Sequence, residues 1–204
     1  MRFEISLERR IEMIGSMRNL AIFVSGGGTN CENIIRYFEG SEKIGIRLVV
    51  SNRADAFALV RAERLGVPTA VVTKAELNDP EGPTLALLRQ YEVEAIVLAG
   101  FLPLVPDWLI DAFPRAIINL HPARLPKFGG KGMYGHHVHE AVKAAGETET
   151  GMTVHYVSPV CDGGDIIAQF RTALSPNDTV DDIAEKEHVL EMKHFPKVIE
   201  EVFG

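Results

Sequence analysis

Two side chains capable of acid–base and oxyanion chemistry follow an apolar run near the middle of the chain. Asn119 and His121 come directly after the apolar pair at positions 117–118, and Pro122 interrupts the run. An amide donates hydrogen bonds to a developing oxyanion, and an imidazole moves protons near neutral pH. Asp162, on a turn before two glycines, supplies a carboxylate that would orient the imidazole if the fold brings them together. The alternative is structural: Asn119 caps a turn and His121 packs under Pro122.

A glycine-rich segment at positions 25–30, with the sequence Ser-Gly-Gly-Gly-Thr-Asn, lies between a predicted strand and a predicted helix. Free backbone N–H groups and the helix dipole at such a turn favour an anion, typically a phosphate, and Thr29 and Asn30 add side-chain donors. The segment lacks the Gly-Lys-Ser/Thr ending of a Walker A loop and the third glycine of a dinucleotide fingerprint. The sequence therefore predicts phosphate binding here, with a tight turn that binds nothing as the alternative.

The chain alternates short apolar runs with segments of helical periodicity. Such alternation is typical of right-handed crossovers in a parallel sheet, and continuous apolar strands indicate a sheet that is covered on both faces. The carboxyl end of a parallel strand, where Asn119 and His121 would lie, is where open α/β sheets bind ligands. The predicted strands are 20–24, 46–50, 70–72, 95–99 and 116–118, and the predicted helices are 29–38, 56–65, 85–91, 108–113 and 136–145.

The pattern changes after position 121. Segments 152–157 and 165–171 are predicted to be neighbouring antiparallel strands, and 178–204 is predicted to be a long helix that Pro196 kinks or splits. We therefore expect an α/β fold with an open, mostly parallel twisted sheet, helices on both faces and an antiparallel strand in the C-terminal half. Positions 18–204 are expected to form a single domain after an N-terminal extension or tag at 1–17.

Composition and charge argue against several classes of protein. The formal net charge of -7 argues against broad nucleic-acid binding, and no apolar run is long enough to span a bilayer. The 2 cysteines give no disulfide framework and suit a cytoplasmic location. His136, His139 and Glu140 share helical spacing, but no cysteine or downstream acid completes a zinc site, so no metal is expected.

Six segments, in order along the chain, together resemble the glycinamide ribonucleotide (phosphoribosylglycinamide) formyltransferases, a folate-dependent family. They are 25–30, 51–56, 98–101, 119–128, 151–157 and 162–164, and the resemblance extends from about position 19 to position 203. The resemblance implies a Rossmann-like formyltransferase fold. It also implies transfer of a formyl group from 10-formyltetrahydrofolate, as co-substrate, to the amine of glycinamide ribonucleotide in de novo purine biosynthesis.

The resemblance assigns three groups of residues to the expected site. Asn119, His121 and Asp162 would be catalytic, with Asp162 stabilising the imidazolium and so making His121 more basic than an isolated histidine. The ribonucleotide would contact Gly27, Gly28, Thr29, Asn30 and Glu191, the first four of them through its phosphate. The pterin ring of the folate would contact Leu102, Leu104, Val105, Val157, Val160 and Cys161.

The sequence also departs from the family in three places and leaves two alternative functions. Positions 1–17 have no counterpart in the family. The segment 73–83 looks shorter than in relatives, and the loop 129–135 looks longer. One alternative is a formyltetrahydrofolate hydrolase, and the other is a phosphate- or nucleotide-binding module without catalysis. The expected partners are the ribonucleotide and the folate, with no nucleic acid and no membrane, and the expected assembly is a monomer or a homodimer.

Overall fold

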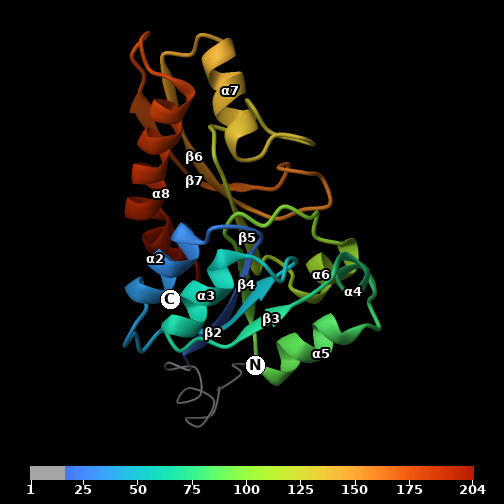
Figure 1. The fold of residues 1–204 in the computed structure, drawn as a ribbon. Helices are drawn as coiled ribbons and strands as arrows, with labels where there is room; N and C mark the ends of the chain where they lie inside the picture. Colours follow the sequence, from blue (N-terminus) through green and yellow to red (C-terminus); the bar gives the residue numbers. More distant parts are fainter. Residues whose placement is uncertain (1–16) are drawn as a thin grey trace, which may run out of the picture.

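The computed structural model describes residues 17–204, so the predicted N-terminal extension at 1–17 lies outside the described residues except for its last position. Figure 1 shows a central sheet with helices on both sides. The strands are β1 (Arg18–Val24), β2 (Ile44–Ser51), β3 (Thr69–Val71), β4 (Ala95–Leu98), β5 (Ile117–His121), β6 (Glu149–Tyr156) and β7 (Ile166–Ala173). The helices are α2 (Thr29–Tyr37), α3 (Phe57–Arg64), α4 (Lys74–Asn78), α5 (Pro83–Gln90), α6 (Asp107–Ala112), α7 (His136–Ala144) and α8 (Val180–Phe203).

The strands form one sheet in the order β3-β2-β1-β4-β5-β6-β7. The strands β1 to β5 are parallel to one another, whereas β6 is antiparallel to β5 and β7 is antiparallel to β6. The predicted Rossmann-like sheet, mostly parallel with an antiparallel part in the C-terminal half, is thus confirmed. The strand order reverses between β1 and β4, and such a reversal opens a crevice for ligands at the carboxyl ends of the strands.

Alternate side chains of β1 enter two separate layers of the core, as the period of a strand requires. Leu20 and Ile22 pack in the layer that contains the buried residues of α2, α3 and α8. Ala21 and Phe23 pack in the opposite layer, against α4, α5 and α6. Both faces of the sheet are therefore covered, which explains why the parallel strands read as continuous apolar runs.

The strand β5 and the helix α4 differ from their sequence-based predictions. The strand predicted at 116–118 continues to His121, because Asn119 and His121 pair with His155 and Thr153 of β6. The helix α4 was not predicted, although its start carries a readable signal. Thr73 accepts from the backbone N–H of Glu76, and the Glu76 side chain accepts from the backbone N–H of Thr73, which makes a complete capping box.

Helix α8 runs unbroken through Pro196, so of the two predicted effects of this proline, a kink or a split, the split does not occur. A proline inside a helix leaves the carbonyl four residues earlier without its hydrogen bond. Here the Asn33 side chain on α2 donates to that carbonyl, Met192 O, at 2.8 Å. Pro196 is itself buried between Phe195 and Val198, so packing also holds the helix together. Among the helices described for residues 17–204, none combines the length and apolar character needed to cross a membrane.

Candidate active site

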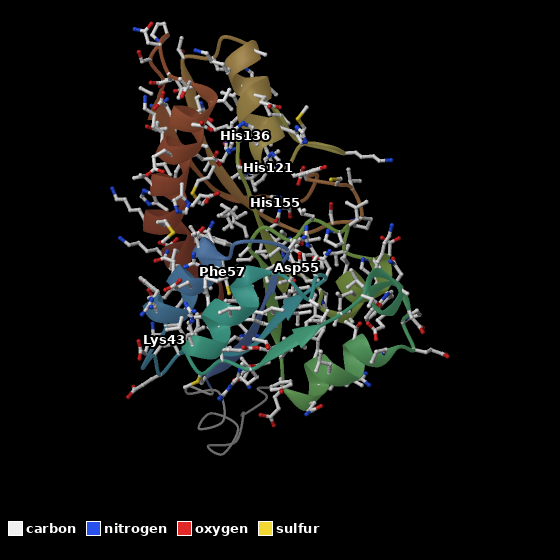
Figure 2. All side chains as sticks on the ribbon, in the orientation of Figure 1. Lys43, Asp55, Phe57, His121, His136 and His155 are labelled. Atoms are coloured by element: carbon white, nitrogen blue, oxygen red, sulfur yellow. The ribbon has the colours of Figure 1, made fainter. Side chains whose placement is uncertain are left out.

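One cavity of about 1060 Å³ opens where the carboxyl ends of β1, β4 and β5 meet their following loops. It also receives side chains from β6 and α8, and Figure 2 shows His121 and His155 close together below α7. The structure brings every residue of the three predicted groups to this cavity. The lining includes Gly27, Gly28, Thr29, Asn30, Leu102, Leu104, Val105, Asn119, His121, Val157, Val160, Cys161, Asp162 and Glu191.

The loop between β1 and α2 presents a bare helix start to the cavity. Gly28 is the N-cap of α2 with a φ of 76°, and within the described structure no side chain caps this helix start. The carbonyls of the loop are used on the α3 side, since Gly26 O accepts from the backbone N–H of Ala58 at 3.1 Å and Gly27 O accepts from Arg61 Nε at 2.9 Å. The first N–H groups of a helix have no intrahelical acceptor, so this loop suits an anion.

Asn30 connects the anion loop to α8. Its Nδ2 donates to Glu191 Oε2 at 2.8 Å, and His188 Nδ1 lies 3.3 Å from the same oxygen. The contact with Glu191 raises the pKa of His188 above its ordinary value. Asn30 Oδ1 has no hydrogen-bond partner within residues 17–204. An acidic and amide wall beside an anion loop fits a ligand that carries hydroxyl or amine donors next to its phosphate.

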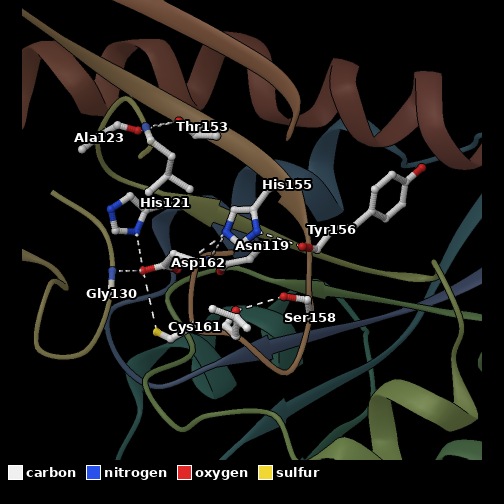
Figure 3. A network of polar contacts seen from close by, with 12 residues as sticks. Asn119, His121, Ala123, Gly130, Thr153, His155, Tyr156, Ser158, Cys161 and Asp162 are labelled. Carbon is white, nitrogen blue, oxygen red and sulfur yellow. Dashed lines mark hydrogen bonds and ion pairs between the residues drawn. The ribbon is translucent and has the colours of Figure 1, made fainter. Parts of the chain in front are cut away.

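Asn119 is held by a histidine of the neighbouring strand. His155 Nδ1 lies 2.9 Å from Tyr156 O, and because a carbonyl only accepts, Nδ1 carries the proton. His155 Nε2 then lies 3.1 Å from Asn119 Nδ2 and accepts from that amide whenever Nε2 carries no proton (Figure 3). The amide nitrogen has two N–H bonds, so the second one remains for an oxyanion in the cavity.

His121 is 3% exposed, and its Nε2–H donates to Phe128 O at 2.8 Å. The free nitrogen Nδ1 lies 3.6 Å from Asp162 Oδ2. Burial lowers the pKa of His121 below its ordinary value, and the charge of Asp162 offsets this only in part. The expectation that His121 is more basic than an isolated histidine is therefore wrong, because desolvation outweighs a carboxylate beyond hydrogen-bond distance. The resting imidazole is neutral near pH 7 and accepts protons at Nδ1.

Asp162 adopts a φ of 55°, in the left-handed region that aspartate tolerates better than most residues. Its Oδ2 accepts from the backbone N–H of Gly130 at 2.8 Å, and its Oδ1 lies 3.6 Å from His155 Nε2. Burial alone would raise the pKa of Asp162, but the contacts with His155 and Gly130 and the charge of His121 hold it below its ordinary value. A side chain at Gly164 would place its Cβ 1.8 Å from Tyr156 O, so the turn after Asp162 requires glycine.

Three parts of this network were not predicted from the sequence. His155 lies in the segment 151–157, but its contact with Asn119 depends on the antiparallel register of β5 and β6. The support from Phe128 O and Gly130 N comes from backbone atoms, which no residue pattern reveals. Glu187 also lines the cavity. The sequence feature that could have indicated this is its position four residues before Glu191 on α8, which places both side chains on the same face of the helix.

The third predicted group forms an apolar wall on the other side of the polar network. Leu102, Leu104 and Val160 are 53%, 67% and 68% exposed, which is unusual for large apolar side chains lining one cavity. Val157 packs on the core layer of α5 and α6. Cys161 Sγ lies 3.8 Å from Asp162 Oδ2, and burial and this carboxylate raise the pKa of the thiol. The wall suits a flat, largely apolar ring, and the thiol is not activated as a nucleophile.

The cavity thus combines an anion loop, an acceptor-rich wall, an amide donor, a neutral imidazole beside an ionised carboxylate, and an apolar wall. This arrangement can hold an anionic ligand and a ring ligand together. Between them, Asn119 can stabilise an oxyanion while His121 and Asp162 accept and return a proton.

The fold and this site define a class of protein, and comparison with known families agrees with it. A family model described as formyl transferase matches residues 18–199, and the chain belongs to this family. Among solved structures, phosphoribosylglycinamide formyltransferase from Anaplasma phagocytophilum is similar with a TM-score of 0.82 and 32% sequence identity, covering 91% of this chain and 86% of that chain.

Curated relatives carry the same name. The chain is 40% identical to chloroplastic phosphoribosylglycinamide formyltransferase from Arabidopsis thaliana over 192 residues, which cover 92% of this chain and 64% of the relative. The match to the corresponding protein from Vigna unguiculata has 38% identity and covers 61% of that protein. This chain therefore spans less than two thirds of the length of either plant protein. The phosphoribosylglycinamide formyltransferase of Bacillus subtilis is 37% identical, and the match covers 92% of this chain and 96% of that protein.

Proposed function

We propose that this chain transfers a formyl group from 10-formyltetrahydrofolate to the amine of glycinamide ribonucleotide in de novo purine biosynthesis. The observation that supports this best is the meeting of an anion loop, a proton-transfer group and an apolar wall in one cavity. A phosphate on one substrate and a pterin ring on the other match the two ends of that cavity. The names of relatives at 37% and 40% identity support the same assignment.

In the proposed mechanism the ribonucleotide amine attacks the formyl carbon, and a new C–N bond forms. Asn119 donates its free N–H to the oxygen that becomes an oxyanion. The amine proton moves to Nδ1 of the neutral His121, through a water molecule because the imidazole is only 3% exposed. Asp162 stabilises the resulting imidazolium across 3.6 Å, and the proton then passes to the folate nitrogen as its bond to the formyl carbon breaks. The positive charge on His121 thus arrives with the transferred proton rather than before it.

A direct assay separates this proposal from its two alternatives. Purified protein is mixed with 10-formyltetrahydrofolate, with and without glycinamide ribonucleotide, and the absorbance of the folate is followed. Formyl transfer predicts a change only when both substrates are present. A change without the ribonucleotide would instead support a formyltetrahydrofolate hydrolase, and no change in either sample would support a binding module.

Asn119→Ala is expected to lower kcat by about 10² to 10³-fold, the usual effect of removing one oxyanion donor. The KM for the ribonucleotide should change little, because the anion loop is separate from Asn119. Steady-state kinetics with both substrates measure the two constants. Asn177→Ala, at an exposed turn, is the matched control and should behave as the unchanged protein. Equal turnover of the two variants would remove Asn119 from the mechanism.

Gly28→Ala is expected to raise the KM for the ribonucleotide strongly, because the added Cβ would lie 2.4 Å from Ala58 Cβ and push the anion loop off α3. Gly66→Ala is the control, since Gly66 has a similar φ of 74° but nothing within 4 Å of the added Cβ. Both variants carry the cost of a left-handed alanine, about 1 kcal/mol. Only Gly28→Ala should lose affinity for inorganic phosphate in a competition assay. Similar phosphate affinities for both variants would contradict the anion role of the loop.

The proposal names the ribonucleotide and the folate as substrates, and neither nucleic acid nor a membrane as a partner. All residues of the proposed site come from one chain, so a monomer or a homodimer would serve equally. The proposed location is the cytoplasm, which the two free cysteines favour. Residues 18–204 would act as a single domain, since one sheet carries every element of the site.

A further inference from the structure

A second buried titratable pair joins α7 to α8, beside the polar network already described. His139 and Glu187 are 8% and 1% exposed, and His139 Nδ1 lies 3.1 Å from Glu187 Oε2. No hydrogen bond is described for this nitrogen or for either carboxyl oxygen among residues 17–204, so the 3.1 Å approach is the polar contact that the structure gives them. Burying polar atoms without partners is costly. The two side chains therefore depend on each other for a polar neighbour.

The pKa shifts of this pair favour two neutral groups over an ion pair. Burial, with the nearby charge of Glu191, raises the pKa of Glu187 to about 10, and burial lowers the pKa of His139 below its ordinary value. Near neutral pH a protonated carboxyl group then faces Nδ1 of a neutral imidazole across 3.1 Å, and the carboxyl group supplies a donor to the pair. A glutamine at position 187 would keep such a donor, and a leucine would not.

The His139–Glu187 pair connects the segment that supports His121 and Asp162 to the part of α8 that holds the anion loop. His139 is in the first turn of α7, directly after the loop 129–135. At the other end of that loop, Phe128 O accepts from His121 and Gly130 N donates to Asp162. Glu187 lies four residues before Glu191, which holds Asn30 of the anion loop. A displacement of α7 relative to α8 would therefore move the supports of His121 and Asp162 away from the ribonucleotide end of the cavity.

We propose that Glu187 and His139 are positioning residues for the reaction, and that their buried contact fixes α7 and the segment 128–135 so that His121 and Asp162 face the bound ribonucleotide. This inference rests on the proposed function for its kinetic readout. Neither side chain is assigned a contact with substrate, because both carboxyl oxygens of Glu187 are inaccessible to solvent. Their effect passes through the backbone of the segment that holds the two catalytic groups.

The test compares Glu187→Leu, Glu187→Gln and the double variant Glu187→Leu/His139→Leu with a control, Glu201→Leu, at an exposed position of α8. Glu187→Leu should lower kcat about tenfold or more, since a shift of about 1 Å in a reacting group costs up to about 10²-fold. Its KM for the ribonucleotide should stay within about threefold. The NMR titration midpoint of His121 should move to lower pH, because the contacts with Phe128 and Asp162 both raise that pKa. Glu187→Gln should restore most of the turnover and the midpoint, and Glu201→Leu should change neither.

The double variant separates positioning from stability. Removing both polar groups leaves none unpartnered, so its thermal midpoint should recover relative to Glu187→Leu. Its kcat and its His121 midpoint should remain low. If the double variant recovers its thermal midpoint, its kcat and its His121 titration midpoint, the positioning role is overturned. A folded Glu187→Leu protein with unchanged kcat and an unchanged His121 midpoint would overturn it as well. If the unchanged protein transfers no formyl group, the proposed function fails, whereas the His121 titration still decides whether the pair positions the site.

Discussion

Replacing His121 with alanine is expected to lower kcat by about 10² to 10⁴-fold, the range for loss of a positioned acid–base group. The reason is that the neutral His121 offers Nδ1 as a proton acceptor 3.6 Å from Asp162 Oδ2, whereas His155 Nε2 at the same distance from this carboxylate is engaged by Asn119. The other nitrogen of His121, Nε2, donates to Phe128 O, so Nδ1 is the nitrogen of His121 that can receive the proton. The KM for the ribonucleotide should stay within about threefold, because the polar contacts described for His121 among residues 17–204 are with Phe128 and Asp162 and not with the anion loop.

Steady-state kinetics of His121→Ala beside His136→Ala provide the check. His136 is an exposed histidine at the start of α7, so its replacement removes the same side chain from a place outside the polar network. His136→Ala should keep the turnover of the unchanged protein. A purified, folded His121→Ala protein with near-normal turnover would exclude His121 as the proton acceptor.

Asp162→Asn is expected to reduce kcat by roughly 10²-fold or more, because the imidazolium formed during proton transfer loses its only described carboxylate within 4 Å among residues 17–204. The amide keeps the size of the side chain and can still accept from the N–H of Gly130, so the turn should hold. The substitution therefore tests the charge of Asp162 rather than its shape.

Asp162→Asn is also expected to shift the pH dependence of kcat/KM. His121 must be neutral to accept a proton, so kcat/KM falls on the acid side as pH drops through the pKa of His121. Burial places that pKa below the ordinary histidine value of about 6.5. Asp162 raises it, so removing the charge in Asp162→Asn should move the acid limb to still lower pH. If the acid-side fall of kcat/KM moved to higher pH in Asp162→Asn, Asp162 could not be raising the pKa of His121 as proposed.

Asp165→Asn is the matched control for this charge change. Asp165 lies just beyond the same turn, but its side chain is 75% exposed and pairs with Arg115 at 2.8 Å. Its replacement should leave both kcat and the acid limb unchanged. If both aspartate variants lost activity equally, a general loss of negative charge near the turn would explain the effect better than a specific role for Asp162.

Much of the fold could be predicted from the sequence, because it depends on local patterns. The apolar runs that become β1 and β4 are continuous, and this alone indicates a sheet covered on both faces. The glycine loop before α2 and the polar residues at the end of β5 could be placed at one edge of the sheet for the same reason. Helix α4 was missed although its capping box is local, and the split at Pro196 was wrong because Asn33, which replaces the lost hydrogen bond, comes from another helix.

The sequence by itself determined which side chains were available: an anion loop at 25–30, an amide and an imidazole after one apolar run, and a carboxylate on a glycine turn. Only the tertiary structure decided how they act. The antiparallel register of β6 brings His155 to Asn119, and the loop after Phe128 gives its backbone to His121 and Asp162. Burial then reverses the expected basicity of His121. The physical reason is that residue type fixes what a group can donate or accept, whereas distance and desolvation arise only when separate segments pack together.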